Sequence, residues 1–169
     1  MPSAWDELET KVADTMAAIK IADPEATPFA ADLGNVHRFR PEHEHSNNLG
    51  AYYCVDVDGE RVVRAWCVFV EQAVDFDTID TSTLLLDCTV TAWYSKGVGG
   101  SGVQLLKQHV SVVQGALRAL KVDLGGVVSH IVDWSQVSYR SEANPVEKVE
   151  GDVIVGEFRF TGRRGMAVI

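Results

Sequence analysis

The stretch SGVQLLKQHVSVVQGALRAL, residues 101–120, decides the fold class of this chain. Its apolar residues recur at alternating spacings of four and three, which is the pattern of one helical face: Leu106, Val110, Val113, Leu117 and Leu120. Ser101 follows a glycine-rich run and is a residue type that caps helix N-termini. We therefore predict one long amphipathic helix over residues 101–120.

Strand patterns surround this helix on both sides. Residues 52–57 and 61–72 predict a hairpin with Asp58-Gly59 at its turn, and residues 83–94 alternate as a sheet with one covered face does. Residues 127–139 and 153–161 are also predicted strands, separated by a loop at 140–145. An acidic connector is predicted at 75–80.

A second helix is predicted over residues 4–20, where Trp5, Leu8, Val12, Met16 and Ile19 share one face. The fold class is therefore α+β: a mostly antiparallel sheet with one long amphipathic helix packed across it and an N-terminal helix. We expect a single domain over residues 1–169, with an exposed loop at 29–50 and a flexible tail at 162–169.

Charge and composition exclude several classes of protein. The formal net charge of −9 opposes simple electrostatic binding of nucleic acid, yet it suits a channel through which DNA slides without sticking. No apolar run approaches the roughly 20 residues that cross a bilayer, so no membrane association is expected. Three widely spaced cysteines predict buried free thiols rather than disulfides or a zinc site.

Histidines and glycines offer weak candidates for ligand binding. His37, His43 and His45 could share a metal ion, but His43 and His45 lie in a loop-like segment and no fourth ligand is evident, so we expect no metal. The run Gly97–Gly102 precedes a helix, where a phosphate could bind, but it lacks the lysine and order of a P-loop. A strand-to-helix connector is the favoured interpretation.

Other residues are weighed against structural roles. The acidic pairs Asp56 and Asp58, and Asp75 to Asp80, favour turns and solubility. His109 is placed near the polar flank of its helix, and His130 beside Asp133 lacks a nucleophile motif. Three strand tryptophans could line a cavity but favour a core: Trp66, Trp93 and Trp134.

The whole order resembles the tail-terminator (neck) proteins of long-tailed bacteriophages. The likeness is carried by residues 64–71 leading to 84–93, by the helix at 103–120, and by VEGDVIVGEFRFT at 149–161. The resemblance implies a virion structural protein, assembled in the bacterial host cytoplasm, that forms a hexameric ring. Such a ring caps the tail tube, halts its growth and docks to the head.

The same resemblance implies partners and the kind of site. The partners would be other copies of the chain, a tail tube protein and a head-completion (connector) protein, with DNA passing through the lumen without specific binding. No cofactor and no catalysis are implied. The family has no strict motif, so subunit edges would carry the function, with Arg61, Arg64 and Glu71 fixing register.

Two alternatives stay open. One is a small-molecule binding protein or enzyme of hotdog or NTF2-like architecture, whose cavity would be lined by Phe69 and the strand tryptophans. The other is a different head–tail completion or tube-associated protein, because such proteins also assemble through the edges of sheets.

Overall fold

The structure is a computed structural model and describes residues 4–22, 30–31, 33–38, 49–57, 59–77, 81–119, 130–132, 134–146 and 151–167. The helices are α1 (Ala4–Ala17), α3 (Leu49–Tyr53), the 3-10 turn η1 (Val98–Gly100) and α4 (Ser101–Arg118). The strands are β1 (Ile21–Ala22), β2 (Ala30–Ala31), β3 (Asn35–His37), β4 (Cys54–Val57), β5 (Glu60–Asp77), β6 (Thr81–Ser95), β7 (His130–Val132), β8 (Ser138–Glu142) and β9 (Val153–Ala167). The predicted α+β class is confirmed.

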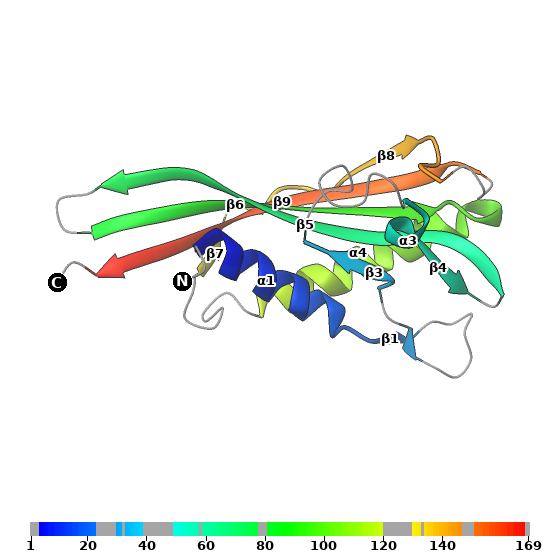
Figure 1. Cartoon of the computed structure of the whole chain (residues 1–169), viewed down its shortest axis with the longest axis horizontal. Coiled ribbons are helices and arrows are strands. Elements are labelled where there is room, and N and C mark those ends of the chain that lie inside the picture. Colours follow the sequence, from blue (N-terminus) through cyan, green and yellow to red (C-terminus); the bar gives the residue numbers. More distant parts are fainter. Residues whose placement is uncertain are drawn as a thin grey trace.

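The long strands β5, β6 and β9 form the centre of a mixed sheet (Figure 1). β6 pairs antiparallel with both β5 and β9, so β5 and β9 run in the same direction. On the outer side of β5 lie β4, antiparallel, and β3, parallel. On the outer side of β9 lie β7 and β8, both antiparallel. β1 and β2 pair with each other outside this sheet.

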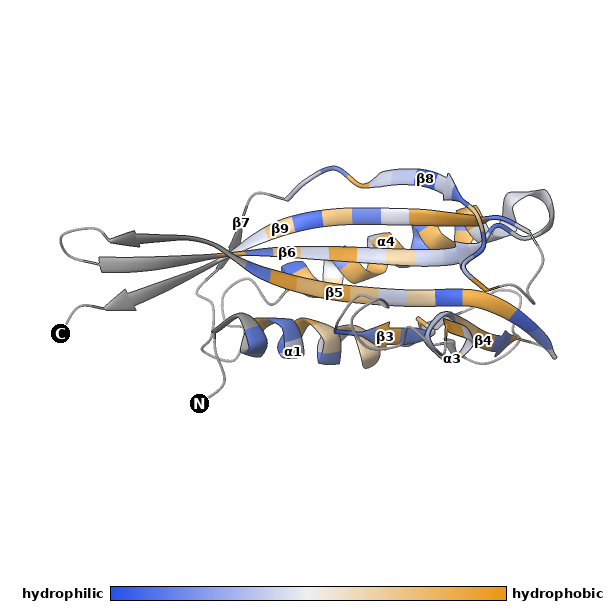
Figure 2. Cartoon of the chain, turned by 45° about the horizontal axis from the view of Figure 1, so that its top comes forward, coloured by the Kyte–Doolittle hydropathy of each residue, from blue (hydrophilic) through white to orange (hydrophobic). Residues whose placement is uncertain are grey.

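Both long helices cover the same face of the sheet (Figure 2). The predicted stripe of α4 is buried at Leu106, Val110, Val113 and Leu117, and α1 buries Leu8, Val12 and Met16. Alternate residues of the strands complete this core, including Trp66, Val68 and Val70 of β5 and Leu86, Cys88 and Val90 of β6. The helix face and the strand alternation therefore specify one common core.

A smaller core lies on the opposite face, under α3. Tyr52 and Tyr53 of this short helix pack against Val63 and Ala65 of β5 and Val153 and Val155 of β9. Asn35 of β3 supports the end of α3, because its Nδ2 lies 3.0 Å from the carbonyl oxygens of Ala51, Tyr52 and Cys54. These carbonyls are the ones that a helix C-terminus leaves without partners.

Several predicted boundaries are wrong. Residues 52–53 are helical rather than part of the hairpin, and 75–77 continue β5 rather than forming a connector. Residues 162–167 belong to β9 rather than to a flexible tail, because they pair with 81–86 of β6. Within the predicted exposed loop at 29–50, Leu33 is buried and 35–37 form β3, whereas 39–48 lie outside the described residues.

The start of α4 also differs from the prediction. Gly100, in the left-handed conformation with φ of 79°, is the N-cap, and no side chain caps the helix. Ser101 is the first helical residue instead. The predicted strand at 127–139 is interrupted, since β7 and β8 are separate, and 140–142 belong to β8 rather than to a loop.

Candidate functional site

The most distinctive feature of the surface is an end of the sheet that continues past the helices. We call residues 74–77 of β5, 81–85 of β6 and 163–167 of β9 the extension (Figure 1). Its strands stay in register, with Asp75 opposite Leu84 and Leu84 opposite Arg164. In the part of the chain that the structure describes, no strand pairs with the outer side of β5 beyond Cys67 or of β9 beyond Arg163.

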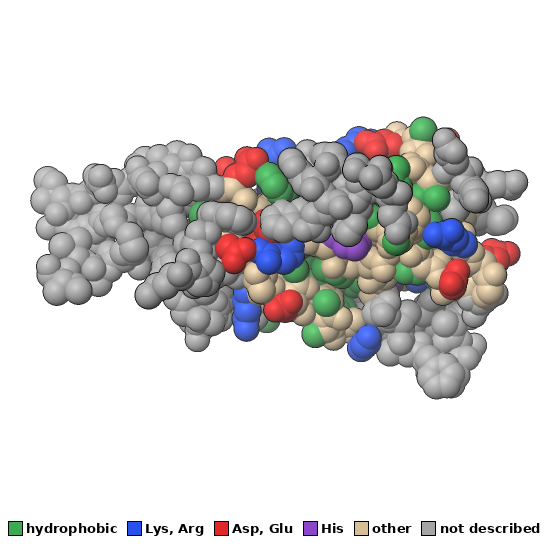
Figure 3. Space-filling view, in the orientation of Figure 1, with side chains coloured by type: hydrophobic (Ala, Val, Ile, Leu, Met, Phe, Trp, Pro, Cys, Tyr) green, Lys and Arg blue, Asp and Glu red, His purple; other side chains and the backbone are tan. Residues whose placement is uncertain are grey.

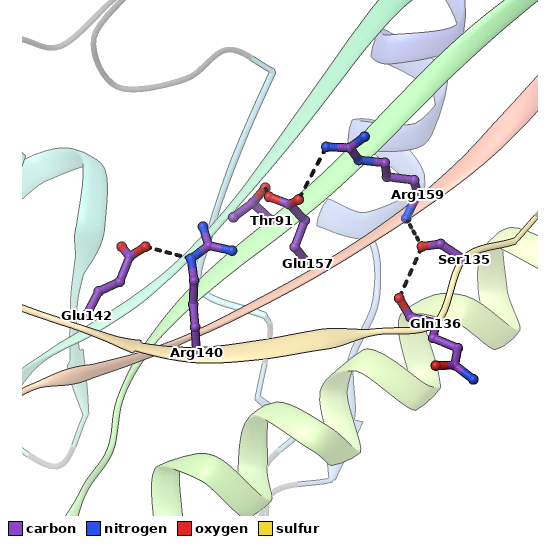
Figure 4. A network of polar contacts seen from close by, with 7 residues as sticks. All are labelled: Thr91, Ser135, Gln136, Arg140, Glu142, Glu157 and Arg159. Carbon is purple, nitrogen blue, oxygen red and sulfur yellow. Dashed lines mark hydrogen bonds and ion pairs between the residues drawn. The ribbon is translucent and has the colours of Figure 1, made fainter.

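The outer edge of β9 is closed along the body of the molecule. β8 pairs with residues 153–157 and β7 with 161–163, and Ser135 fills the gap between them. The Ser135 N–H donates to Arg159 O at 2.9 Å, and the Arg159 N–H donates to Ser135 Oγ at 2.8 Å (Figure 4). The backbone of β9 is therefore covered from Val153 to Arg163.

The outer edge of β5 is closed in a similar way. β4 pairs with residues 60–63 and β3 with 65–67. Beyond β3, the backbone N–H of Val70 donates to Glu9 Oε2 of α1 at 3.0 Å. A side chain thus takes the place of a strand, which is one means by which edges are blocked.

The Glu9 carboxyl is fully buried, and its burial raises its pKa to about 7. The Val70 N–H and the positive charge of Arg38 act in the opposite direction but do not cancel the effect of burial. Arg38 Nε lies 3.2 Å from Glu9 Oε1, and the same guanidinium pairs with Asp6. Sequence reasoning missed this cluster, although Glu9 directly follows Leu8 of the buried stripe.

The three predicted interface residues do not form one surface. Arg64 lies on the helix-covered side, with its guanidinium 5.6 Å from the centre of the Tyr94 ring. Arg61 and Glu71 are exposed on the other side but lie ten positions apart, about 33 Å along a strand. Glu71 lies opposite Asp87 of β6, so two acidic residues are neighbours near the start of the extension.

The metal interpretation finds no support at His37. His37 Nε2 lies 2.9 Å from the carbonyl oxygen of Tyr52, and its ring stacks on the Tyr52 ring with centroids 3.8 Å apart. Because a carbonyl only accepts, this nitrogen carries a proton and donates. His43 and His45 lie outside the described residues. Among the residues that are described, no three or more His, Cys, Asp or Glu lie together so that they could hold a metal ion.

The glycine-rich run acts as a close connector between β6 and α4. The N–H of Gly102 donates to Lys96 O at 2.7 Å. A Cβ at Gly102 would lie 1.8 Å from Ser95 O, so only glycine fits there. Packing of the helix start against the end of β6 therefore accounts for Gly102, in agreement with the connector interpretation.

His109 is buried rather than near the polar flank of α4 as predicted. Its Nδ1 lies 2.5 Å from the Tyr94 hydroxyl, which also lies 3.3 Å from Leu33 O. Trp66 Nε1 donates to the same hydroxyl at 2.9 Å. This buried polar network links β5, β6 and α4, and the Tyr94 hydroxyl makes the burial of His109 possible.

The aromatic residues proposed for a ligand cavity are divided between the two faces. Trp66 and Trp134 lie on the helix side, where Trp134 packs on Phe158 and Phe160. Trp93 lies on the opposite side, against Tyr52 and Tyr53. Because the sheet separates these tryptophans, they cannot line one cavity.

The cysteines are free thiols, as predicted: Cys67 and Cys88 are buried, and Cys54 is half-buried. Burial raises the pKa of the Cys88 thiol well above its ordinary value, so it stays protonated. Of the paired acids, Asp56 is exposed on β4, whereas Asp58 and Asp80 lie outside the described residues. His130 lies on β7, and Asp133 is likewise outside them.

Charge on the body of the molecule is mixed. On the face shown in Figure 3, acidic and basic side chains are interspersed over the coloured part of the surface. Formal charge is better separated along the strands that enter the extension. β5 carries Glu71, Asp75 and Asp77 towards that end, and β9 carries Arg159, Arg163 and Arg164.

Comparisons with known proteins found no matching family model and no match among curated proteins. Among the described residues, no helix is both long enough and apolar enough to span a bilayer. The proposed function therefore rests on the contacts of the described residues. The main features of these residues are buried structural networks, edges of β5 and β9 blocked along the body, and a sheet that continues past the helices.

Proposed function

We propose that this chain is a virion structural protein that acts as a tail terminator: a ring subunit that caps the tail tube and joins it to the head. Its partners would be further copies of itself, a tail tube protein and a head-completion protein. It would be assembled in the bacterial host cytoplasm and reside in the neck of the virion. The work is assembly, so no bond is made or broken.

The observation that carries this proposal is the extension, in which three paired strands continue past the helices (Figure 1). Along the body, Glu9, β3 and β4 cover β5, and Ser135, β7 and β8 cover β9. In the extension, β5, β6 and β9 continue beyond these covering elements and stay paired with one another. Strands of a sheet can pair with other chains, so a sheet end that continues past its helices favours an assembly role.

Charge supports a ring through which DNA passes. The formal net charge of −9 disfavours binding to phosphate groups, because such binding depends on clustered lysine and arginine. An acidic lumen would let DNA slide without holding it. The hotdog and NTF2-like alternative is less well supported, since its expected tryptophan lining is divided between the two faces of the sheet.

Negative-stain electron microscopy of the purified chain tests whether it acts as a terminator or as a tail tube protein. A terminator is expected to give single rings that do not stack, even at high protein concentration. Stacking of the rings into tubes would instead identify a tube protein. Particles without a ring at any concentration would contradict both assembly roles.

A further inference from the structure

We propose that free copies of this chain pair with each other through β8, edge to edge and antiparallel, with Ser141 of one copy opposite Ser141 of the other. This inference goes beyond the proposed function and does not rest on it, because such a two-fold contact turns the two copies in opposite directions. Neighbours in a ring with one face for the tube and another for the head all point the same way. The β8 pair therefore forms between copies outside such a ring.

β8 is an exposed strand at the border of the sheet. It pairs with residues 153–157 of β9, and Figures 1 and 2 both place it outermost on that side of the molecule. In the part of the chain that the structure describes, β9 is the one strand that pairs with it. The residues from Ser138 to Ser141 are all exposed, and Glu142 is partly exposed. A strand in this position can add a further strand through its backbone groups.

The two charged side chains of β8 make the strand complementary to itself. Arg140 Nε lies 2.7 Å from Glu142 Oε1, so both side chains project from the same face of the strand (Figure 4). Their exposed fractions are 48% and 41%, so both can reach a second strand. In an antiparallel pair centred on Ser141, Arg140 of each copy lies directly opposite Glu142 of the other copy. The contact then holds two cross-strand pairs of opposite charge, which stabilise a sheet.

The same charges disfavour the neighbouring registers of a two-fold pair. Residues that lie directly opposite each other project from the same face, so the centre of the pair shifts from Ser141 to Arg140 or to Glu142. A pair centred on Arg140 places two arginines directly opposite each other, and one centred on Glu142 does so with two glutamates. Like charges in that position destabilise a pair of strands. Charge therefore selects the register centred on Ser141.

The other face of β8 carries an aromatic side chain that this contact would cover. Among the residues that the structure describes, Tyr139 and Val112 are the exposed large hydrophobic residues. The Tyr139 ring packs over β9, since a Cβ added at Gly156 would lie 3.2 Å from Tyr139 Cε1. In the register centred on Ser141, Tyr139 lies opposite Ala143 of the other copy, whose small side chain leaves room for the ring. An apolar contact on one face thus accompanies the two ion pairs on the other.

A cross-link is the suitable probe because the pair is weak. A contact through one short strand falls well below the roughly 1,000 Å² that stable interfaces bury, so it forms reversibly. Ser141→Cys places two thiols directly opposite each other, with about 5 Å between their Cβ atoms, close to the range of a disulfide. Ser138→Cys is the matched control on the same exposed strand. Its two copies lie six residues apart in this register, about 20 Å along the strand.

Under mild oxidation, the Ser141→Cys chain should form linked dimers about tenfold faster than the Ser138→Cys chain, because pairing brings its thiols together. Non-reducing electrophoresis of the full chain measures both rates. The wild-type chain under the same conditions gives the background from the half-buried Cys54. Equal rates for the two variants would overturn the β8 pairing.

Charge reversal in the Ser141→Cys chain tests the register. Arg140→Glu alone and Glu142→Arg alone each place like charges opposite each other twice, so each should slow the linking about tenfold. An equimolar mixture of these two variants should recover linking as mixed dimers, which intact mass identifies, because each variant supplies the charge that the other lacks. Lys11→Glu and Asp14→Arg, on exposed positions of α1, are the matched controls and should leave the rate unchanged.

The outcomes are distinct from those that test the proposed function. Failure of the mixture to recover linking that both folded variants have lost would overturn the pairing of Arg140 with Glu142, and circular dichroism checks that each variant is folded. Equal slowing by the α1 controls would also overturn it, since net charge alone would then account for the effect. Rings seen by electron microscopy while Ser141→Cys fails to link would overturn the β8 pairing and leave the proposed function standing.

Discussion

At the scale of single residues, polar groups inside the core hold the elements together. The Tyr94 hydroxyl connects Trp66 of β5 with His109 of α4, and the Glu9 carboxyl connects α1 with the backbone of Val70. A buried polar group without its partner is costly, so each of these contacts specifies one arrangement of helix against sheet.

Tyr94→Phe should lower the free energy of unfolding by about 1–3 kcal/mol, because the hydroxyl that serves Trp66 and His109 is removed from a buried site. Urea denaturation followed by tryptophan fluorescence measures the loss. Tyr139→Phe is the control, since Tyr139 is exposed and its change should stay within about 0.5 kcal/mol. Equal effects of the two substitutions would contradict a structural role of the network.

Glu9 should make stability depend on pH between its unfolded pKa and its folded pKa of about 7. The folded chain keeps the Glu9 proton at pH values where the unfolded chain has lost it. Its contribution to stability is therefore full below the ordinary glutamate pKa of 4.5, and it is lost as pH rises to about 7.

Glu9→Gln keeps an acceptor for the Val70 N–H but removes this titration. Denaturation of both chains at intervals from pH 4 to pH 8 should show the variant gaining stability relative to the wild-type chain as pH rises. A difference that is constant over this range, or that changes in the opposite direction, would contradict the raised pKa of Glu9.

At the scale of elements, steric fit decides where α4 begins. Gly102 lies so close to β6 that an added Cβ would meet Ser95 O at 1.8 Å, whereas the site of Gly115, within the same helix, is open. Gly102→Ala should therefore destabilise the chain by about 1–3 kcal/mol, because the helix start has to shift.

Gly115→Ala is the matched control and should stabilise the chain by up to about 1 kcal/mol, since alanine favours an exposed helix interior. Thermal and urea denaturation of both variants provide the comparison. Two substitutions of the same kind in one helix are thus expected to have opposite signs, and a neutral Gly102→Ala would contradict the close approach.

Elements with a strong internal pattern could be predicted from the sequence. The stripe from Leu106 to Leu117 identified α4, and the alternation from Leu86 to Tyr94 identified β6. Features that depend on distant partners could not be predicted. His109 is buried against Tyr94, and Ser135, between β7 and β8, pairs with Arg159 of β9.

The ends of β5 and β9 could not be predicted from the sequence for the same reason. Residues 75–77 and 162–167 have too few apolar side chains to be recognised as strands, and Asp75 and Asp77 were interpreted as part of a connector. Their strand conformation comes from pairing with β6, which the sequence of either segment does not show. Interface residues were expected at Arg61, Arg64 and Glu71.

At the scale of the whole molecule, the sheet has two parts with different roles. In the body, α1 and α4 cover one face, α3 covers part of the other, and the outer edges of β5 and β9 are blocked. The extension continues the same three strands past the helices. We propose that such a molecule, a covered body with an extension of paired strands, suits a subunit of a closed ring.

The mass of the native particle across a wide range of protein concentrations tests the central claim most directly. The account predicts a closed species of six copies of 18.5 kDa, about 111 kDa, with no larger stacked species at high concentration. A tight dimer at every concentration would contradict the ring and would favour a pocket-bearing fold instead.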